Sequence, residues 1–416
     1  MLFLVVVAGV TYALWPPDRR DGEKVVRQPA LQVPSGKQPI TGIYAAIRVN
    51  LTSVPVDAVE IQIDGPFRVQ PVDNPLRLGE AEKLEATSVT VTKTGFQVGG
   101  THYPVTRLEF HPRQSPAIWV NGHQYRGTLR LFRRPGRKLT AVNVLPLEQY
   151  VASVVDSEMP AAFPDEARQA QAVVARTYAL YQMGQAPRDG LFDVYAGTRS
   201  QKYLGYQYRS AGRLLAGEST TSRQIVDETR GLVCIYGGRL FCTYYSAVCG
   251  GQTLQGTELF DDAAPAVASV PCDYCRDAKY YRWEASLSAE ELRQKLSPIL
   301  GSTSKSWGPV VSLNAVPPVV PGRLAEFDAR YQGGHAMIRA DRLRTALADA
   351  GVRSPSFRVE RRGEFLIHGR GHGHGAGLCQ WGARGQAQLG RTAEQILSYY
   401  YPGSEIVRIA PTVARN

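Results

Sequence analysis

The sequence of 416 residues predicts an α+β fold in which β-structure predominates. Short runs of alternating apolar and polar residues follow one another from about Thr41 to Leu139, separated by glycine and proline. Helical spacing of apolar residues begins only at Leu145 and ends near Gly184. Alternating runs then return, so we expect a two-helix motif flanked by β-sheet.

The N-terminus is an almost unbroken apolar segment, MLFLVVVAGVTYALW, followed by a polar, proline-rich stretch. About 15 apolar residues fall short of the ~20 that span a bilayer, and neither a basic lead-in nor an A-x-A cleavage site is evident. We expect a signal anchor or signal peptide over residues 1–15, a linker over 16–40, and an extracytoplasmic location for the rest. The alternative is a buried core segment.

The chain carries 48 Lys and Arg against 37 Asp and Glu, a net charge of +11. This sign suits anionic partners such as nucleic acid, anionic lipid or an acidic wall polymer. The densest basic run is Arg133, Arg134, Arg137 and Lys138, around a Pro-Gly turn. Because the basic residues form no stripe interleaved with aromatic residues, we do not expect a nucleic-acid partner.

The two predicted helices meet at a turn that contains Glu158-Met159-Pro160. Proline stops the first helix, and Pro164 suits the first turn of the second. Glu158 therefore lies at a helix end on a constrained bend, where a side chain can be presented into a cleft. Arg176, on the facing helix, has the character needed to orient a carboxylate or to contact a polar substrate.

Five acids occupy this motif, and the ordinary interpretation is that all are solvated charges on helix faces. They are Glu148, Asp156, Glu158, Asp165 and Glu166. Glu158 differs because its turn is apolar, and partial desolvation there would raise its pKa toward neutrality. We therefore predict that Glu158 is a general acid and base.

A second motif, HGRGHGHGAGLCQWGARGQAQLG, alternates glycine with His372 and His374. Such a strand allows a ligand or another backbone to approach closely. It is not a nucleotide fingerprint, because it lacks the strand-to-helix context and the later acid. For His374 three roles are open: contact with substrate, buried structural hydrogen bonding, and metal ligation.

The cysteines form a third motif. Cys272 and Cys275 make a C-x2-C knuckle, and Cys249 precedes two glycines, which together suit a structural zinc site. The fourth ligand is open; Cys242 is the nearest cysteine, and a histidine is an alternative. Disulfides compete with zinc, since Cys234 and Cys242 fall in one predicted hairpin, LVCIYGGRLFCTYYS, in an oxidising compartment. A redox role is disfavoured because no thioredoxin-like βαβ unit surrounds the knuckle.

Three segments in this order resemble the stage II sporulation protein D family, which includes the amidase-enhancer proteins. They are SEMPAAFPDEARQAQAVVARTYAL, SAVCGGQT with VPCDYC and YRWE, and GRGHGHGAGLCQWGARGQA with ILSYYYPGSEI. The resemblance runs from about Thr41 to Ile409, and its first and last motifs are long and specific. It implies one family domain over residues 41–410, with a β-rich subdomain at 41–140 and a catalytic part at 141–410.

The resemblance implies lytic transglycosylase activity on peptidoglycan glycan strands stripped of stem peptides. The catalytic glutamate of the family's E-M-P motif falls on Glu158. Cys379 stands where the family usually has serine, and Trp381 where it has tyrosine. The substrate contacts that we expect, some from weaker matches in FDVYAGTRSQKYLG, are Arg176, Gln201, Tyr203, His374, Gln380 and Trp381.

The resemblance also implies a structural zinc ion, with no cofactor needed for the chemistry. The ligands that we expect are Cys242, Cys249, Cys272 and Cys275. Family members often carry histidine three residues before the Cys-Gly-Gly, where this chain has Ser246; Cys242 is the replacement that we favour.

One carboxyl group suffices for a lytic transglycosylase, whereas glycoside hydrolysis ordinarily uses two. Glu158 would protonate the glycosidic oxygen and then accept the proton of the sugar's own C6 hydroxyl, which closes an anhydro ring. Two alternatives stay open. One is a non-catalytic wall-binding protein that stimulates a peptidoglycan amidase. The other is a hydrolase with Asp156 or Asp193 as second acid.

Overall fold

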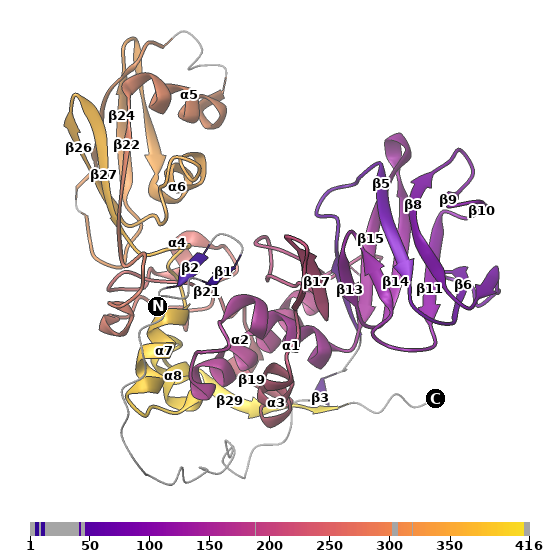
Figure 1. Ribbon diagram of the computed structural model, residues 1–416. Helices are drawn as coiled ribbons and strands as arrows, with labels where there is room; N and C mark the ends of the chain where they lie inside the picture. The colour runs from indigo at the N-terminus through magenta and orange to yellow at the C-terminus, as the bar shows by residue number, and fades with distance from the viewer. Residues whose placement is uncertain are drawn as a thin grey trace. The chain divides into compact units, whose positions relative to one another are not determined.

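The computed structural model describes residues 5–7, 10–12, 41–42, 46–187, 189–301, 307–317 and 319–411 (Figure 1). The chain divides into two units, Met1–Gln32 and Val33–Asn416. In the first unit, strands β1 (Val5–Val7) and β2 (Val10–Tyr12) pair antiparallel. The predicted anchor and linker otherwise lie outside the described residues. Among the described residues, no helix has the length and apolar character that a bilayer span requires.

The first part of the second unit is β-rich, as predicted. Its strands are β3 (Thr41–Gly42), β4 (Ile47–Asn50), β5 (Ala58–Ile63), β6 (Phe67–Pro71), β7 (Gly79–Ala81), β8 (Leu84–Val91), β9 (Phe96–Val98), β10 (Thr101–Tyr103), β11 (Arg107–Pro112), β12 (Ile118–Val120), β13 (His123–Tyr125), β14 (Thr128–Arg134) and β15 (Lys138–Leu145). Within the part of the chain that the structure describes, its one helical turn is η1 (Pro135–Arg137).

Strands β4 to β15 build two sheets with strands from beyond the helices: β16 (Val194–Tyr195), β17 (Gln207–Ser210) and β18 (Arg213–Ala216). Within the described residues, one sheet has the order β10-β9-β8-β5-β12-β13-β17-β18 and the other β16-β4-β15-β14-β11-β6-β7. Period-2 alternation decides which side chains face the core. In β5, Val59, Ile61 and Ile63 are buried, whereas Ala58 and Glu60 are exposed.

The two-helix motif follows as α1 (Leu147–Glu158) and α2 (Asp165–Gln185). Helix α1 ends where predicted, because Met159 precedes Pro160 and adopts an extended conformation, with φ −124° and ψ 130°. Pro164 is the residue before the first turn of α2. Apolar residues of both helices belong to the same hydrophobic core as the two sheets. The β-rich part and the helices are therefore packed as one body.

The predicted hairpin is present as β19 (Leu232–Tyr236) and β20 (Arg239–Leu240). Gly237 and Gly238 form its turn with φ of 57° and 77°, which glycine tolerates at both positions. Strand β29 (Glu405–Arg408) completes this small sheet, and β30 (Ala410–Pro411) pairs with β3. The short helix α3 (Thr220–Glu228) precedes β19.

Two segments far apart in sequence then meet. Strand β21 (Tyr245–Ser246) pairs in parallel with β28 (Leu378–Cys379), which leads directly into α7 (Gln380–Gln388). The other elements around them are α4 (Gly256–Leu259), η2 (Asp273–Cys275) and α8 (Ala393–Tyr400).

Between these two segments the chain forms a module of its own, residues 282–370. Its elements are β22 (Arg282–Leu287), α5 (Ala289–Leu300), β23 (Val310–Ala315), β24 (Glu326–Tyr331), β25 (Gly334–Arg339), α6 (Ala340–Ala346), β26 (Phe357–Arg362) and β27 (Glu364–Arg370). The module has a separate hydrophobic core and two small sheets, β22-β27-β26 and β23-β24-β25. Helices α5 and α6 begin in the segments SAEELRQKL and RADRLRTALADAG. The catalytic part expected over residues 141–410 contains this module undivided.

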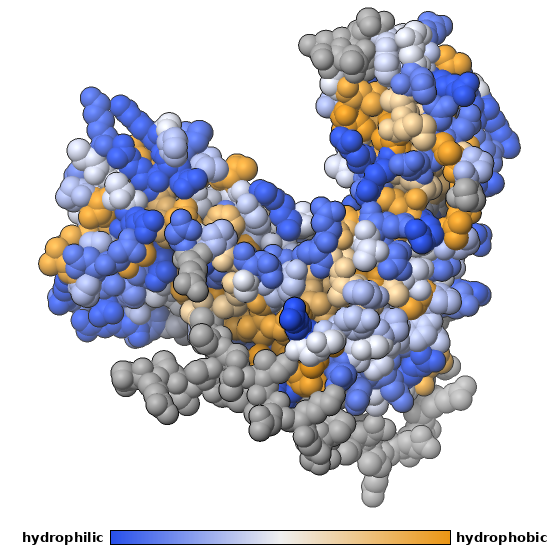
Figure 2. All heavy atoms as spheres, turned by 180° about the vertical axis from the view of Figure 1, so that it is seen from behind, coloured by the Kyte–Doolittle hydropathy of each residue, from blue (hydrophilic) through white to orange (hydrophobic). Residues whose placement is uncertain are grey.

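The module also carries apolar side chains on its surface, at the upper right in Figure 2. Large hydrophobic side chains of the module that are more than a third exposed are Val311, Val316, Val319, Val320 and Met337.

A buried ion pair fastens the two helices to the neighbouring turn. The guanidinium of Arg176 in α2 contacts both carboxylate oxygens of Glu148 in α1, with Nη2 2.7 Å from Oε2. Its Nη1 donates to the carbonyl of Leu232 at 3.0 Å. The Arg176 side chain is fully buried. Breaking such a pair leaves a buried charge without compensation, so the pair holds these elements in place.

We predict that Arg176→Met lowers the free energy of unfolding by about 3–5 kcal/mol, because Glu148 keeps its buried charge and loses its partner. Chemical denaturation of the purified protein measures the change. The matched control is Arg230→Met, which removes an arginine from the exposed ion pair with Asp227 and should change stability far less. Equal effects of the two substitutions would contradict this role for Arg176.

Candidate functional site

Glu158 is the last residue of α1 and is mostly buried. Its backbone position follows from Pro160, which ends the helix and turns the chain. The C-terminal end of a helix carries partial negative charge, which disfavours a carboxylate there. The sequence-predicted acid thus lies in surroundings that favour its protonated form.

Three donors nevertheless point at the carboxyl oxygens of Glu158. Oε1 accepts hydrogen bonds from the backbone amide of Lys202 at 2.8 Å and from the Tyr245 hydroxyl at 3.1 Å. Oε2 lies 3.4 Å from Nε2 of Gln380. The site can therefore hold Glu158 as either acid or carboxylate.

The balance of these effects raises the pKa of Glu158 above its ordinary value. Burial is the largest cause, and the hydrogen bonds from Lys202, Tyr245 and Gln380 act in the opposite direction. A carboxyl with a raised pKa can donate a proton near neutral pH, and its donors stabilise the anion that remains.

Tyr245 is a site residue that sequence reasoning missed. Burial and the nearby Glu158 carboxylate raise the pKa of its phenol well above the ordinary value, so the hydroxyl stays protonated and donates to Glu158. The local sequence Tyr244-Tyr245 gave no signal, because it reads as part of a strand. Only the distant pairing of β21 with β28 places this side chain against the end of α1.

Gln380, one of the expected substrate contacts, lies beside Glu158, and a second glutamine accompanies it. Nε2 of Gln380 also lies 3.4 Å from Oε1 of Gln171 in α2. Gln171 is fully buried, and among the described residues its own Nε2 has no hydrogen-bond partner. A buried donor without an acceptor is costly, so Gln171 marks a position where a ligand oxygen or water would bind.

Trp381 lies beside the turn that follows Glu158. Its ring packs edge-on against Phe163, with centroids 5.4 Å apart, and the Arg384 guanidinium lies 5.0 Å from its ring centroid. This aromatic surface, contributed by α7 and by the turn between α1 and α2, suits contact with the apolar face of a sugar ring.

His374 lies in the segment that leads into β28 and Gln380. Burial lowers its pKa to about 4, so the ring is neutral at physiological pH. Nδ1 accepts from the backbone amide of Ala376 at 3.1 Å, and the ring meets Tyr244 and Phe260 edge-on. These contacts favour the structural role among the three that were open, because they brace the segment that carries Tyr245.

Gln201 and Tyr203 flank Lys202, whose amide contacts Glu158. Gln201 is fully buried and accepts from the Tyr150 hydroxyl at 3.1 Å, and a hydrogen bond with Gln201 partly offsets the raised pKa of Tyr245. The Tyr203 hydroxyl donates to Asn143 at 2.7 Å inside the core. The structure thus places Gln201 beside Tyr150 and Tyr245, and it gives Tyr203, like Arg176, buried structural partners.

The two acids considered as partners for Glu158 are engaged elsewhere. Asp156 Oδ1 lies 2.5 Å from Nη2 of the buried Arg168, and Asp193 Oδ1 lies 2.6 Å from Nη2 of the half-buried Arg48. Both carboxylates are held in ion pairs, so neither is available to activate a water molecule beside Glu158.

The cysteine prediction needs one correction. Three of the four expected residues, Cys249, Cys272 and Cys275, lie together, but the fourth cysteine is Cys379 and not Cys242. Cys242 is buried elsewhere, with its sulfur 3.6 Å from Nε2 of Gln182. The parallel pairing of β21 with β28 sets Cys379 directly opposite Ser246, the position where family members often carry histidine. The cysteine in place of the usual serine was the available signal.

This cluster fits a tetrahedral metal ion. All four sulfur atoms lie within 4.8 Å of one another, and all four residues are buried, free thiols. Cys249 Sγ and Cys275 Sγ are 3.6 Å apart, close to the ~3.8 Å that a tetrahedron with Zn–S bonds of ~2.3 Å requires. Cys379 Sγ also accepts from the backbone amides of Cys249 and Gly382, each at 3.3 Å, which suits a thiolate at the start of a helix.

Within the described residues the six cysteines form no disulfide, and this cluster is the one group of potential metal ligands found. It includes neither His372 nor His374.

Comparison with known proteins identifies two regions. The family model described as stage II sporulation protein matches residues 135–236, and a domain of unknown function, DUF8618, matches 272–377, which contains the module. An uncharacterized protein of Brachyspira hyodysenteriae is 31% identical, over 87% of this chain and 92% of its own length.

Two relatives from Bacillus subtilis have names. Stage II sporulation protein D is 29% identical, over 64% of this chain and 76% of its own length. The amidase enhancer is 26% identical, over 70% of this chain and 45% of its own length. The motifs around Glu158 and Gln380, the match of the family model and these relatives agree: the chain belongs to the stage II sporulation protein D family.

Proposed function

We propose that this chain is a peptidoglycan lytic transglycosylase, a lyase that cleaves peptide-stripped glycan strands with Glu158 as acid and base. The observation that carries the proposal is the setting of Glu158. Its carboxyl group is buried with a raised pKa, and it faces three donors that suit the carboxylate.

Family membership and the names of the relatives support a role at the cell wall. We place the protein outside the cytoplasm, in the cell envelope, tethered to the membrane through the predicted N-terminal anchor or released from it. The basic net charge of +11 suits an acidic wall polymer.

The reaction needs two proton transfers at one carboxyl group. Protonated Glu158 gives its proton to the glycosidic oxygen as the bond from the muramic acid C1 to that oxygen breaks. The carboxylate is stabilised by the Lys202 amide, Tyr245 and Gln380. It then takes the proton of the C6 hydroxyl as the C6 oxygen bonds to C1, which closes the anhydro ring and regenerates the acid. The nucleophile belongs to the substrate, so proximity replaces a bound water molecule.

A hydrolase mechanism has less support. It requires a second carboxylate to activate water, and Asp156 and Asp193 are both held by arginines.

An activator of a peptidoglycan amidase is the second candidate function. Two observations favour it: one relative is named amidase enhancer, and the module of residues 282–370 exposes a group of apolar side chains that a protein partner could cover. The two functions are compatible, because the module and Glu158 lie on different segments.

We further propose that Cys249, Cys272, Cys275 and Cys379 hold a structural zinc ion. Four thiolates would fill the coordination positions of a bound zinc ion, which would make its contribution structural. Its role is to fix the segments that carry Tyr245 and Gln380, because Cys249 follows Tyr245 closely and Cys379 precedes Gln380 directly.

We predict that the products of the reaction identify it and depend on Glu158. Purified full-length protein should release anhydro-muramyl fragments from peptide-stripped glycan strands, and Glu158→Gln should lower the rate by on the order of a hundredfold or more. Mass spectrometry of the products measures both. Asp165→Asn, which removes an exposed acid of the same motif, is the matched control and should keep the activity.

Products with reducing ends would show that the reaction is hydrolysis and would contradict transglycosylation. If folded wild-type protein releases nothing yet accelerates a peptidoglycan amidase, the activator function stands instead.

We predict that the stability of the folded protein depends on pH through Glu158. The raised pKa means that folded protein binds the Glu158 proton more tightly than unfolded chain does. This stability is fully present below the unfolded pKa and is lost as pH rises through the folded pKa. Glu158→Gln, which cannot ionise, should therefore raise the melting temperature at pH 8 relative to wild type and make little difference near pH 4. An equal difference at both pH values would contradict the raised pKa.

We predict that the zinc content of the protein depends on Cys379. Protein purified without chelators should contain zinc, and Cys379→Ser should lose most of it. Inductively coupled plasma mass spectrometry measures the zinc content of both. Cys242→Ser, a buried cysteine outside the cluster, is the control and should retain it. Loss of zinc from the Cys242 variant alone would restore the ligand set expected from the sequence.

A further inference from the structure

A basic pocket lies where the module of residues 282–370 joins the cysteine-bearing segments. Its volume is about 490 Å³, within the range of small-molecule sites. Three arginines line it, Arg276, Arg282 and Arg370, against the single acid Asp273. Three positive charges against one negative charge leave a formal excess of +2 in the pocket wall.

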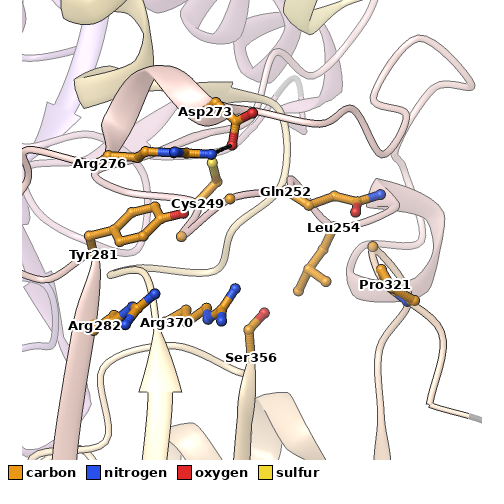
Figure 3. Close-up of a pocket in the computed structure, with 13 residues that line it drawn as sticks. Cys249, Gln252, Leu254, Asp273, Arg276, Tyr281, Arg282, Pro321, Ser356 and Arg370 are labelled. Carbon is orange, nitrogen blue, oxygen red and sulfur yellow. Dashed lines mark hydrogen bonds and ion pairs between the residues drawn. The ribbon is translucent and has the colours of Figure 1, made fainter.

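Two of these arginines are direct neighbours. Arg282 begins β22 and Arg370 ends β27, and the antiparallel register sets them opposite each other. Like charges at opposed positions destabilise a sheet unless an anion lies between or near them. Figure 3 shows both side chains together on one wall of the pocket.

Carboxylates of the protein do not neutralise this pair. Among the described residues, neither Arg282 nor Arg370 has an acidic side chain within 4 Å. Glu284, two positions along the same strand, is hydrogen-bonded instead to His368 at 3.0 Å. The two guanidinium groups therefore keep their donors for a ligand.

The opposite wall contributes a third arginine, which is already paired with an acid, and uncharged hydroxyl groups. Arg276 bonds Asp273 at 2.8 Å, with both side chains exposed, so the pair is easily exchanged for another anion. Tyr281 and Ser356 contribute hydroxyl groups to the lining. Figure 3 shows Tyr281 between the Arg276 side and the Arg282 side.

The arrangement of two guanidinium groups selects among anions. One guanidinium fork takes both oxygens of a carboxylate. A tetrahedral anion offers further oxygens, so two adjacent forks can share it, and the doubly charged form compensates both arginines. The remaining volume, with its hydroxyl groups, accommodates a small polar group attached to the anion.

We propose that this pocket binds a phosphate ester of a small polyol or sugar through Arg282 and Arg370. The proposal is independent of the glycan-cleaving function, because the pocket shares no lining residue with the Glu158 site. One wall includes Cys249, so the alternative is that the arginines only offset the negative charge of the cysteine cluster.

The test is calorimetric titration of zinc-containing, full-length protein at constant ionic strength. Glycerol 3-phosphate should bind at least as tightly as inorganic phosphate, and acetate should not compete. The double variant Arg282→Gln/Arg370→Gln should bind both phosphates on the order of tenfold more weakly or worse, because hydrogen bonds to charged groups are lost. Arg358→Gln, an exposed arginine of the same module paired with Glu360, is the matched control and should bind normally.

Several outcomes would overturn the proposal. Unchanged phosphate binding in the double variant, equal weakening in Arg358→Gln, equal binding of acetate, or failure of glycerol 3-phosphate to bind would each do so. Faster loss of zinc to a chelator in the double variant, without any phosphate binding by wild type, would establish the charge-offset role instead. Thermal melting of the double variant and of Arg370→Gln alone shows that a lost signal is not lost folding.

Discussion

The candidate site depends on the short parallel pairing between β21 and β28. Two register pairs, Tyr245 with Leu378 and Ser246 with Cys379, join segments more than 130 residues apart in sequence. This pairing delivers the two side-chain donors of Glu158, Tyr245 from one strand and Gln380 from the residue after the other. It also brings Cys379 to the three cysteines of the other segment. The acid and the cysteine cluster therefore share one structural support.

Two opposing sets of interactions determine the pKa of Glu158. Burial and the end of α1 favour the protonated acid, whereas the Lys202 amide, Tyr245 and Gln380 favour the carboxylate. A general acid that must later act as a base needs both, because a purely apolar pocket would prevent ionisation and a fully polar one would prevent protonation near neutral pH. In the proposed reaction, the ion pairs that hold Asp156 and Asp193 leave this task to Glu158.

Local sequence signals predicted those features of the fold and site that depend only on residues close together in the sequence. Pro160 and Pro164 set the bounds of the two helices, Gly237 and Gly238 marked the hairpin, and the apolar turn singled out Glu158. Contacts set by distant pairing escaped prediction: Tyr245 lay in an ordinary strand pattern, and Cys242 was preferred to Cys379 because it is closer in sequence. Arg176 was expected at the substrate, but residue type alone could not reveal that its partner is the buried Glu148.

Glu158 is a mostly buried acid whose pKa is raised by burial and lowered by the hydrogen bonds of Tyr245 and Gln380. The most direct measurement is a ¹³C NMR titration of the glutamate carboxyl groups, in which the Glu158 resonance is the one missing from Glu158→Gln. We expect a midpoint above the ordinary value of 4.5, and a further rise in Tyr245→Phe, because that variant loses a donor to the carboxylate. A midpoint at or below 4.5, unchanged by Tyr245→Phe, would contradict this expectation.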